Sequence, residues 1–288
     1  MTLLVGCDFS SRPDRRKPIV IARGRLRAGE VTLQALQRLD SLDAYASWLA
    51  AETAWVGGFD FPFGLPRELV QELGWPTQWQ ALMRLYAGMT RGEIRERFAA
   101  FCAARPAGGK FAHRATDRWA GSSPSMKWVN PPVAWMLHAG VPPLIDAGVC
   151  LPGLHAGAAD DVDARGRPRR IALEAYPGLL AREVLGRVSY KSDDRSKPVG
   201  PRREQRERLL DALQAGQTRL ALRLAVTAQQ RGQLLDDGRG DTLDAVLCLM
   251  QAAWGWQRGW PDYGLPMPVD PLEGWIVTAL AAQGNRPQ

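Results

Sequence analysis

Residue types that form disulfide frameworks and zinc sites are scarce in this sequence. Its 288 residues include four cysteines and three histidines. The cysteines contain no C-x-x-C pair, and each lies among apolar residues, as a small core side chain does. We therefore predict neither a zinc site nor disulfide bonds for Cys7, Cys102, Cys150 and Cys248.

Long apolar runs are also missing. The longest candidate, residues 245–254, contains Gln251 and is much shorter than the roughly 18 residues of a membrane span. The N-terminal segment Leu3-Leu4-Val5 has no basic flank and runs into Asp8, which is not the pattern of a secretory signal peptide. The sequence shows no internal repeat. We expect a protein without membrane contacts that acts in the cytoplasm.

The balance of charge is basic in an otherwise ordinary globular composition. Apolar residues make up 45% of the chain and charged residues 23%, and 37 Lys and Arg face 30 Asp and Glu, a net charge of +7. A basic surface attracts polyanions such as nucleic acids or anionic headgroups. An arginine-rich composition that reflects only a genome rich in G and C explains the same charge without any partner.

The pattern of apolar residues predicts alternating strands and helices. Short apolar runs predict strands at residues 3–8, 17–22, 31–36, 55–60 and 170–176, with residues 23–30 as a connecting turn. Helical spacing behind Asp40-Ser41 predicts a helix over 42–52. Region 62–168 breaks this order, with helices expected at 67–73, at 77–87, from 90 onward and at 131–138. Beyond 176 we expect a helix to about 185, a basic loop at 187–203, a long helix at 204–233 and a last hydrophobic helix at 241–256.

This order of elements resembles the ribonuclease H-like core. We predict an α/β fold with a mixed five-stranded sheet in the order 3-2-1-4-5, flanked by helices. Residues 1–288 are expected to form one such domain, and 62–168 a helical and loop-rich insertion between the fourth and fifth strands.

Isolated carboxylates end several of the predicted strands. Asp8, Asp60 and Glu174 lie at or near the C-terminal ends of predicted parallel strands, where α/β sheets bind their ligands. Asp241 and Asp244 are three residues apart and share one side of a helix start. Clustered carboxylates resist joint ionisation unless a cation lies among them, and Mg²⁺ and Mn²⁺ prefer such oxygen ligands. These acids are the candidate catalytic and metal-ligating residues.

Each acid also has a structural interpretation. Asp8 and Asp60 are also typical of turns that end a strand, and Asp241 with Asp244 of an N-cap followed by an acid in the first turn. Glu174 lies inside an apolar run, so it needs either burial or a partner.

The segments around these acids resemble a known family. Gly6-Cys7-Asp8-Phe9-Ser10, Gly58-Phe59-Asp60-Phe61-Pro62-Phe63-Gly64, Glu174-Ala175-Tyr176-Pro177 and Asp241-Thr242-Leu243-Asp244-Ala245 are similar to the signature segments of domain-of-unknown-function family 429. The resemblance implies a ribonuclease H fold and a nuclease. The Asp-x-x-Asp-Ala segment is also similar to the terminal acidic pair of Holliday-junction resolvases of the RuvC type, which implies that Asp8, Asp241 and Asp244 bind metal.

Candidate substrate-binding residues come from polar segments outside the strands. Ser10 follows Asp8, Arg114 and Lys127 belong to hydroxyl-rich, cationic stretches of the insertion, and Lys191 belongs to the basic loop. Such side chains contact phosphates of nucleic acids. A helical insertion with core aromatics, followed by a solvated loop, explains the same residues without a substrate.

Together these features predict a Mg²⁺- or Mn²⁺-dependent nuclease that cleaves DNA or RNA by a two-metal mechanism. A nucleotide phosphotransferase of the actin-like superfamily is an alternative, although the loop after Asp8 has no glycine and no glycine-rich adenosine motif follows. A module of the same fold that binds nucleic acid or protein without catalysis is the other alternative.

Overall fold

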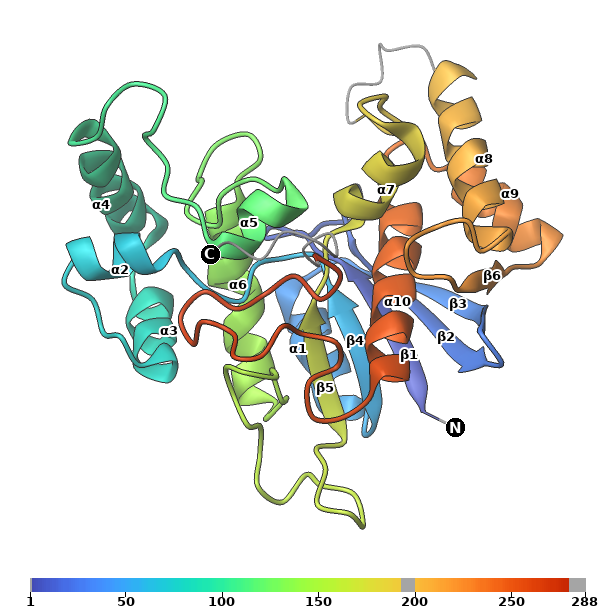
Figure 1. The fold of residues 1–288 in the computed structure, drawn as a ribbon, viewed down its shortest axis with the longest axis horizontal. Coiled ribbons are helices and arrows are strands. Elements are labelled where there is room, and N and C mark those ends of the chain that lie inside the picture. Colours follow the sequence, from blue (N-terminus) through green and yellow to red (C-terminus); the bar gives the residue numbers. More distant parts are fainter. Residues whose placement is uncertain (1, 193–199, 280–288) are drawn as a thin grey trace.

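A mixed six-stranded sheet flanked by helices forms the centre of the protein in a computed structural model that describes residues 2–192 and 200–279 (Figure 1). The strands follow the order β5-β4-β1-β2-β3-β6. The pairs β1-β2 and β2-β3 are antiparallel. The pairs β1-β4, β4-β5 and β3-β6 are parallel. The strand bounds are β1 Leu3–Asp8, β2 Ile19–Arg27, β3 Glu30–Leu39, β4 Trp55–Phe59, β5 Arg170–Glu174 and β6 Arg223–Ala225.

The α/β prediction is confirmed, but the predicted five-stranded order differs from the observed sheet because β6 adds an edge strand beside β3. The expected helix over 204–233 was wrong. The chain forms α8 (Gly200–Gln214), then β6, then α9 (Ala228–Asp236). Gly216 adopts a φ of +70° and ends the first helical stretch, and Thr227 caps the second by accepting from the Gln230 N–H. The helical periodicity on both sides concealed this break.

The turn between β2 and β3 is tighter than the predicted connection over 23–30. β2 continues to Arg27 and β3 begins at Glu30, so Ala28 and Gly29, both with positive φ, form the turn. Such turns match the twist of a hairpin. The outer part of β2 carries exposed, charged residues, which is why apolar runs alone missed it.

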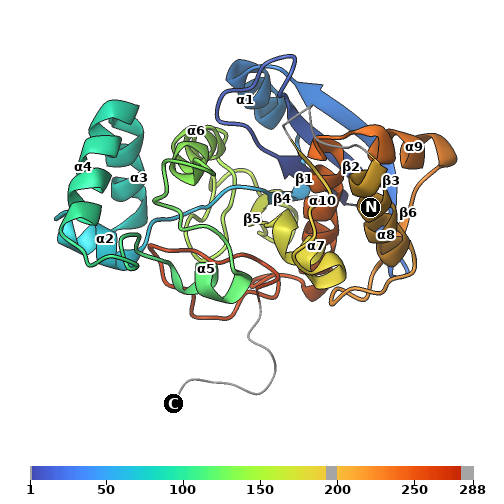
Figure 2. The ribbon, with the colours of Figure 1, turned by 90° about the horizontal axis from the view of Figure 1, so that it is seen from above.

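Helices α2 to α6 occupy the region between β4 and β5 that corresponds to the expected insertion 62–168. In Figure 2, α2, α3 and α4 lie away from the sheet, and α6 lies between them and α1, with contacts to both α1 and α3. Helix α6 extends beyond the expected 131–138 because its buried Leu137, Val141 and Leu144 continue the apolar face past two prolines. The bounds are α1 Leu42–Ala51, α2 Arg67–Glu72, α3 Trp79–Gly88, α4 Arg91–Ala103, α5 Ala115–Ala120 and α6 Val133–Asp146.

The sheet has an apolar core on each face. One face packs against α1 and the insertion, and the other against α7 (Pro177–Leu185), α8, α9 and α10 (Asp241–Arg258). Figure 2 shows α1 and α10 on opposite faces. Within the described ranges, no helix has the length and apolarity that a membrane crossing requires.

Two glycines bring α10 into direct backbone contact with the sheet. A Cβ on Gly6 of β1 would lie 2.0 Å from the Ala245 carbonyl oxygen, and one on Gly58 of β4 would lie 2.4 Å from the Cys248 carbonyl oxygen. These glycines are paired across the two strands. Any side chain there would push the helix away, so this part of the sequence sets where the start of α10 lies.

Candidate functional site

Strand alternation directs Asp8 and Asp60 to the face that α10 covers. Successive side chains of a strand point to opposite faces, so Asp8 shares a face with Gly6, and Asp60 with Gly58, two residues earlier in each case. The Asp60 N–H donates to the Cys7 carbonyl at 2.9 Å, which continues the pairing of β4 with β1 to the end of both strands. Both carboxylates therefore lie at one end of the sheet, beneath α10.

The first turn of α10 adds two further carboxylates. Asp241 is 9% exposed and Asp244 is fully buried. Neither caps the helix: the N-cap residue is Gly240, and the side chain of Asp237 accepts from the Thr242 N–H at 2.9 Å. We call Asp8, Asp60, Asp241 and Asp244 the aspartate cluster, because Asp244 interacts electrostatically with each of the other three.

Burial and mutual repulsion shift the titration of this cluster. Burial, followed by the charge of Asp244, raises the pKa of Asp60 to about 7 and that of Asp8 well above its usual value. Burial, Asp237 and Asp244 raise the pKa of Asp241 to about 6. Carboxylates in this arrangement resist joint ionisation, so the cluster favours an added cation.

Lys191 supplies one such cation. Its ammonium group contacts one oxygen of Asp244, and the Tyr190 hydroxyl donates to the other. The Lys191 side chain keeps 43% of its surface exposed, whereas Asp244 has none. Lys191, predicted to bind substrate, thus reaches the cluster from the cleft side and lies against its most buried member.

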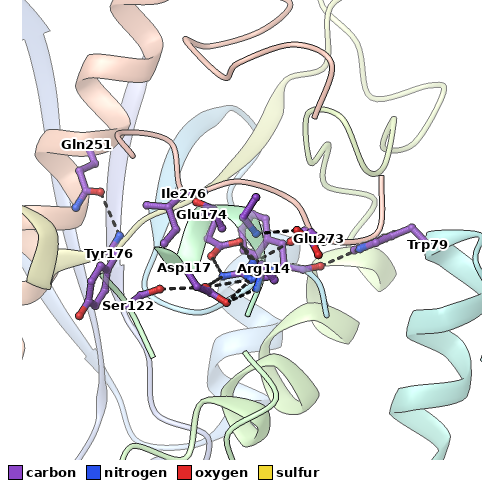
Figure 3. A network of polar contacts seen from close by, with 12 residues as sticks. Trp79, Arg114, Asp117, Ser122, Glu174, Tyr176, Gln251, Glu273 and Ile276 are labelled. Carbon is purple, nitrogen blue, oxygen red and sulfur yellow. Dashed lines mark hydrogen bonds and ion pairs between the residues drawn. The ribbon is translucent and has the colours of Figure 1, made fainter. Parts of the chain in front are cut away.

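Glu174 does not join the aspartate cluster, because its pairing position in the sheet is shifted by one residue relative to Asp60. Glu174 pairs with Phe59 rather than with Asp60, so alternation directs it to the opposite face of the sheet. There it is 3% exposed and accepts from two guanidinium nitrogens of Arg114, at 2.6 and 2.8 Å, and from the Phe63 N–H at 3.0 Å (Figure 3). Each of its oxygens accepts from at least one of these donors, and its charge also contributes to the raised pKa of Asp60.

Arg114, predicted to bind substrate, is instead 2% exposed and fully engaged. A guanidinium has five N–H donors. In Arg114 they reach Asp117, Glu174 and the Glu273 carbonyl (Figure 3). Burial alone would lower its pKa, but Asp117 and Glu174 outweigh burial and raise the pKa, so Arg114 remains a cation. It has no donor left for a phosphate.

The aspartate cluster opens into a cleft of about 950 Å³ between the sheet and the insertion. Asp8, Asp60 and Asp241 line it together with Lys191 and with Ser10, which was predicted from the sequence to bind substrate. Lys127 is absent from the described lining residues of this cleft. The cationic residues of the walls are Arg12, Lys17, Arg91, Arg95, Lys191 and Arg239.

Sequence reasoning missed the contribution of α4 to this cleft. Arg91 and Arg95 are four residues apart and therefore face the same side of the helix. Arg91 donates to the Ser11 carbonyl at 2.9 Å, and its guanidinium lies 5.5 Å from the ring centre of Trp135, which also lines the cleft. The spacing was visible in the sequence, but the contact between the start of α4 and the loop that follows β1 was not.

The donor set of the cluster suits Mg²⁺ or Mn²⁺, which take carboxylate oxygens. Across residues 2–192 and 200–279, however, no group of three or more His, Cys, Asp or Glu side chains is arranged to hold a metal ion. The basic loop predicted at 187–203 falls partly outside the described residues. Comparisons of the chain with models of protein families, with curated proteins and with solved structures each found no match.

Proposed function

We propose that this protein is a metal-dependent nuclease that hydrolyses phosphodiester bonds. One observation carries the proposal: the aspartate cluster lies at the floor of a large cleft whose walls bear arginines and lysines. Acidic side chains at the floor suit a divalent cation, and basic walls suit a phosphate backbone. The net charge of +7 is in keeping with a polyanionic partner.

Asp8, Asp60, Asp241 and Asp244 would hold the Mg²⁺ or Mn²⁺ after a rearrangement of their side chains, because in the described residues no three such groups are arranged for a metal ion. Repulsion between neighbouring carboxylates supports this assignment, because it adds to burial in raising the pKa of Asp60 and of Asp241. Lys191 already neutralises part of this charge through Asp244, so we propose that it moves away when the ion binds. When bound, the ion would activate water and stabilise the leaving oxygen.

The other residues of the cleft would bind and orient the strand. Arg91 is fixed by its contacts with Ser11 and Trp135, which supports a role in holding a phosphate in one position. Arg12, Arg95 and Arg239 extend the basic wall along the cleft. Glu174 takes no part in this proposal, because Arg114 occupies its oxygens.

We also propose that the sheet is a ribonuclease H-like core of family 429. The support is the antiparallel β1-β2-β3 meander, followed by α1 and a parallel β4 beside β1. Conserved chemistry is not implied by a shared fold, so the activity needs its own test.

The direct test is cleavage of labelled single strands, duplexes and branched junctions of DNA and RNA, with Mn²⁺, with Mg²⁺ or with EDTA. We expect metal-dependent cleavage that Asp8→Asn reduces at least about 100-fold, because a metal contributes several kcal/mol to such a reaction. Asp211→Asn, whose side chain is 62% exposed on α8, serves as the control and should keep full activity. Cleavage that survives Asp8→Asn would overturn the proposal.

A non-catalytic module that binds nucleic acid is the second candidate. The contact between Lys191 and Asp244 favours it, because a lysine that permanently occupies Asp244 takes one carboxylate away from a metal. In that case, strands bind in EDTA, Mn²⁺ produces no cleavage, and the melting temperature does not change with Mn²⁺.

A further inference from the structure

A second, smaller cavity of about 230 Å³ adjoins the cleft at its floor. The two share Asp60, Lys191, Pro131 and Met136, so the small cavity opens directly beside the aspartate cluster. Its remaining walls are mainly apolar and come from the end of β4, the start of α6, the turn after β5 and the C-terminal segment. They include Phe61, Pro62, Val133, Tyr176 and Ile276. We call it the Tyr176 pocket.

The polar end of the Tyr176 pocket is not suited to a phosphate. Arg114 and Glu174 line it, but every N–H donor of Arg114 is engaged by protein oxygens. With Asp117 beside it, this group carries more negative than positive charge. This group therefore repels an anion, whereas a neutral group avoids this repulsion.

The walls of the pocket are held in place. The Tyr176 N–H donates to Gln251 at 3.1 Å, and the Tyr176 hydroxyl accepts from Arg182, whose guanidinium lies 5.2 Å from the ring centre. Ile276 is fixed through its N–H, which donates to the Thr116 hydroxyl at 2.9 Å. Figure 3 shows Tyr176, Ile276 and Ser122 on one side of the Arg114 group. Preformed apolar walls with a few polar groups are typical of sites for small neutral rings.

We propose that the Tyr176 pocket binds one nucleobase of a single strand whose backbone lies in the cleft. A nucleobase is a flat, neutral ring with polar edges, and it matches apolar walls beside Ser123 and Ser122, whose hydroxyl donates to Asp117 and can still accept. The basic walls of the neighbouring cleft bind the phosphates on either side. This inference rests on the proposed function only in taking nucleic acid as the partner.

The pocket also defines the substrate class. In a duplex, the base would have to leave its stack before it could enter, at a cost of a few kcal/mol, whereas a base of a single strand is free to enter. The protein therefore selects single strands, and positions the phosphate next to the captured base at the aspartate cluster.

The test measures binding in EDTA, so that it does not depend on cleavage. The probes are a short labelled single strand, in deoxy and ribo forms, its duplex, and a strand of the same length made of abasic sites. We expect the base-bearing single strand to bind at least about tenfold more tightly than the abasic strand. It should also bind more tightly than the duplex.

Val133→Trp fills the pocket and should abolish this preference while leaving the weaker binding of the abasic strand unchanged. Val133→Phe repeats the test with a smaller ring if the indole lowers the melting temperature. Val129→Trp is the matched control, because Val129 is 49% exposed and lies outside the described lining of the pocket. It should keep the preference.

Two results would overturn the claim that the Tyr176 pocket binds a nucleobase. One is equal binding of base-bearing and abasic strands by the wild type, and the other is a preference for the base-bearing strand that survives in a folded Val133→Trp variant. A free nucleoside monophosphate that binds as tightly as the strand overturns the assignment to a strand. Cleavage with Mn²⁺, measured on the same strands, separates the two proposals. Base preference without cleavage contradicts only the proposed nuclease activity, and cleavage without base preference contradicts only the proposed base binding.

Discussion

At the scale of single residues, the direction of each carboxylate follows from its position relative to a neighbouring glycine. Asp8 and Asp60 each lie two residues after a glycine that touches α10, so they share the face of the sheet that this helix covers. Glu174 pairs with Phe59 and points the other way. The sequence predicted that these acids lie at strand ends, but not their faces, because the pairing register depends on strands distant in the chain.

The raised pKa of Asp60 predicts a pH-dependent stability in EDTA. Between its usual value of 3.8 and the folded value of about 7, the folded protein holds a proton that the unfolded chain has lost. The free energy of unfolding therefore falls as pH rises through this window. Asp60→Asn removes this loss, so its melting temperature should exceed that of the wild type near pH 8 by about 2–4 °C, the shift that about 1 kcal/mol produces at this size.

The difference between Asp60→Asn and the wild type should shrink toward about pH 5, where Asp60 is already protonated. Burial lowers the pKa of His113 and His138, which gives the opposite slope, but both proteins contain these groups and their effect cancels in the difference. A difference in melting temperature that does not vary with pH contradicts the assignment.

The buried position of Arg114 predicts a structural rather than a substrate-binding role. Arg114→Met leaves Glu174 and Asp117 buried without their cation, which should reduce the free energy of unfolding by about 3–5 kcal/mol. Arg219→Met breaks a pair with Glu183 in which the arginine is 41% exposed, and should cost about 0–1 kcal/mol. Urea unfolding of both variants measures this, and equal losses would count against the role assigned to Arg114.

At the scale of elements, α10 is the helix that assembles the candidate site. Its backbone touches β1 and β4 at Gly6 and Gly58, and this contact brings Asp244 beside the strand aspartates. The helix itself, together with α1, β1 and β4, was predictable from local apolar patterns. The split of the expected 204–233 helix around β6 was not, because β6 has three residues and is stabilised by its pairing with β3.

The close contact at Gly6 predicts that one added methyl group lowers the free energy of unfolding. Gly6→Ala places a Cβ 2.0 Å from the Ala245 carbonyl, so α10 or β1 must shift, with an expected loss of about 1–3 kcal/mol or more. Gly232→Ala in α9 is the matched control, because it has open space and should be neutral or stabilising. Thermal or urea unfolding compares the two, and a neutral Gly6→Ala would refute the packing described here.

At the scale of the whole molecule, the cleft exists because the insertion faces the carboxyl ends of β1 and β4. Helix α4 carries Arg91 and Arg95 to the wall opposite the aspartate cluster. The composition predicted a polyanionic partner but not where such a partner would bind, since the position of α4 relative to the sheet depends on tertiary packing. Basic walls around an acidic floor are the property on which the proposed function depends.

The basic wall predicts salt-sensitive binding of single strands in EDTA. Arg95→Ala should weaken binding of all sequences alike and reduce the slope of log affinity against log salt by about 1. Arg208→Ala, on the exposed side of α8 and outside the described lining of the cleft, should leave the slope unchanged. Fluorescence anisotropy over a series of salt concentrations gives both slopes, and an unchanged slope for Arg95→Ala would remove α4 from the binding surface.

Calorimetric titration with Mn²⁺ tests most directly whether the aspartate cluster holds a divalent cation, as we propose. We predict that the wild type and Glu174→Gln bind Mn²⁺ alike, since Arg114 engages Glu174, whereas Asp8→Asn and Asp244→Asn bind at least about tenfold more weakly. Undetectable binding of Mn²⁺ to the wild type, or equal binding to wild type and Asp8→Asn, would contradict the account.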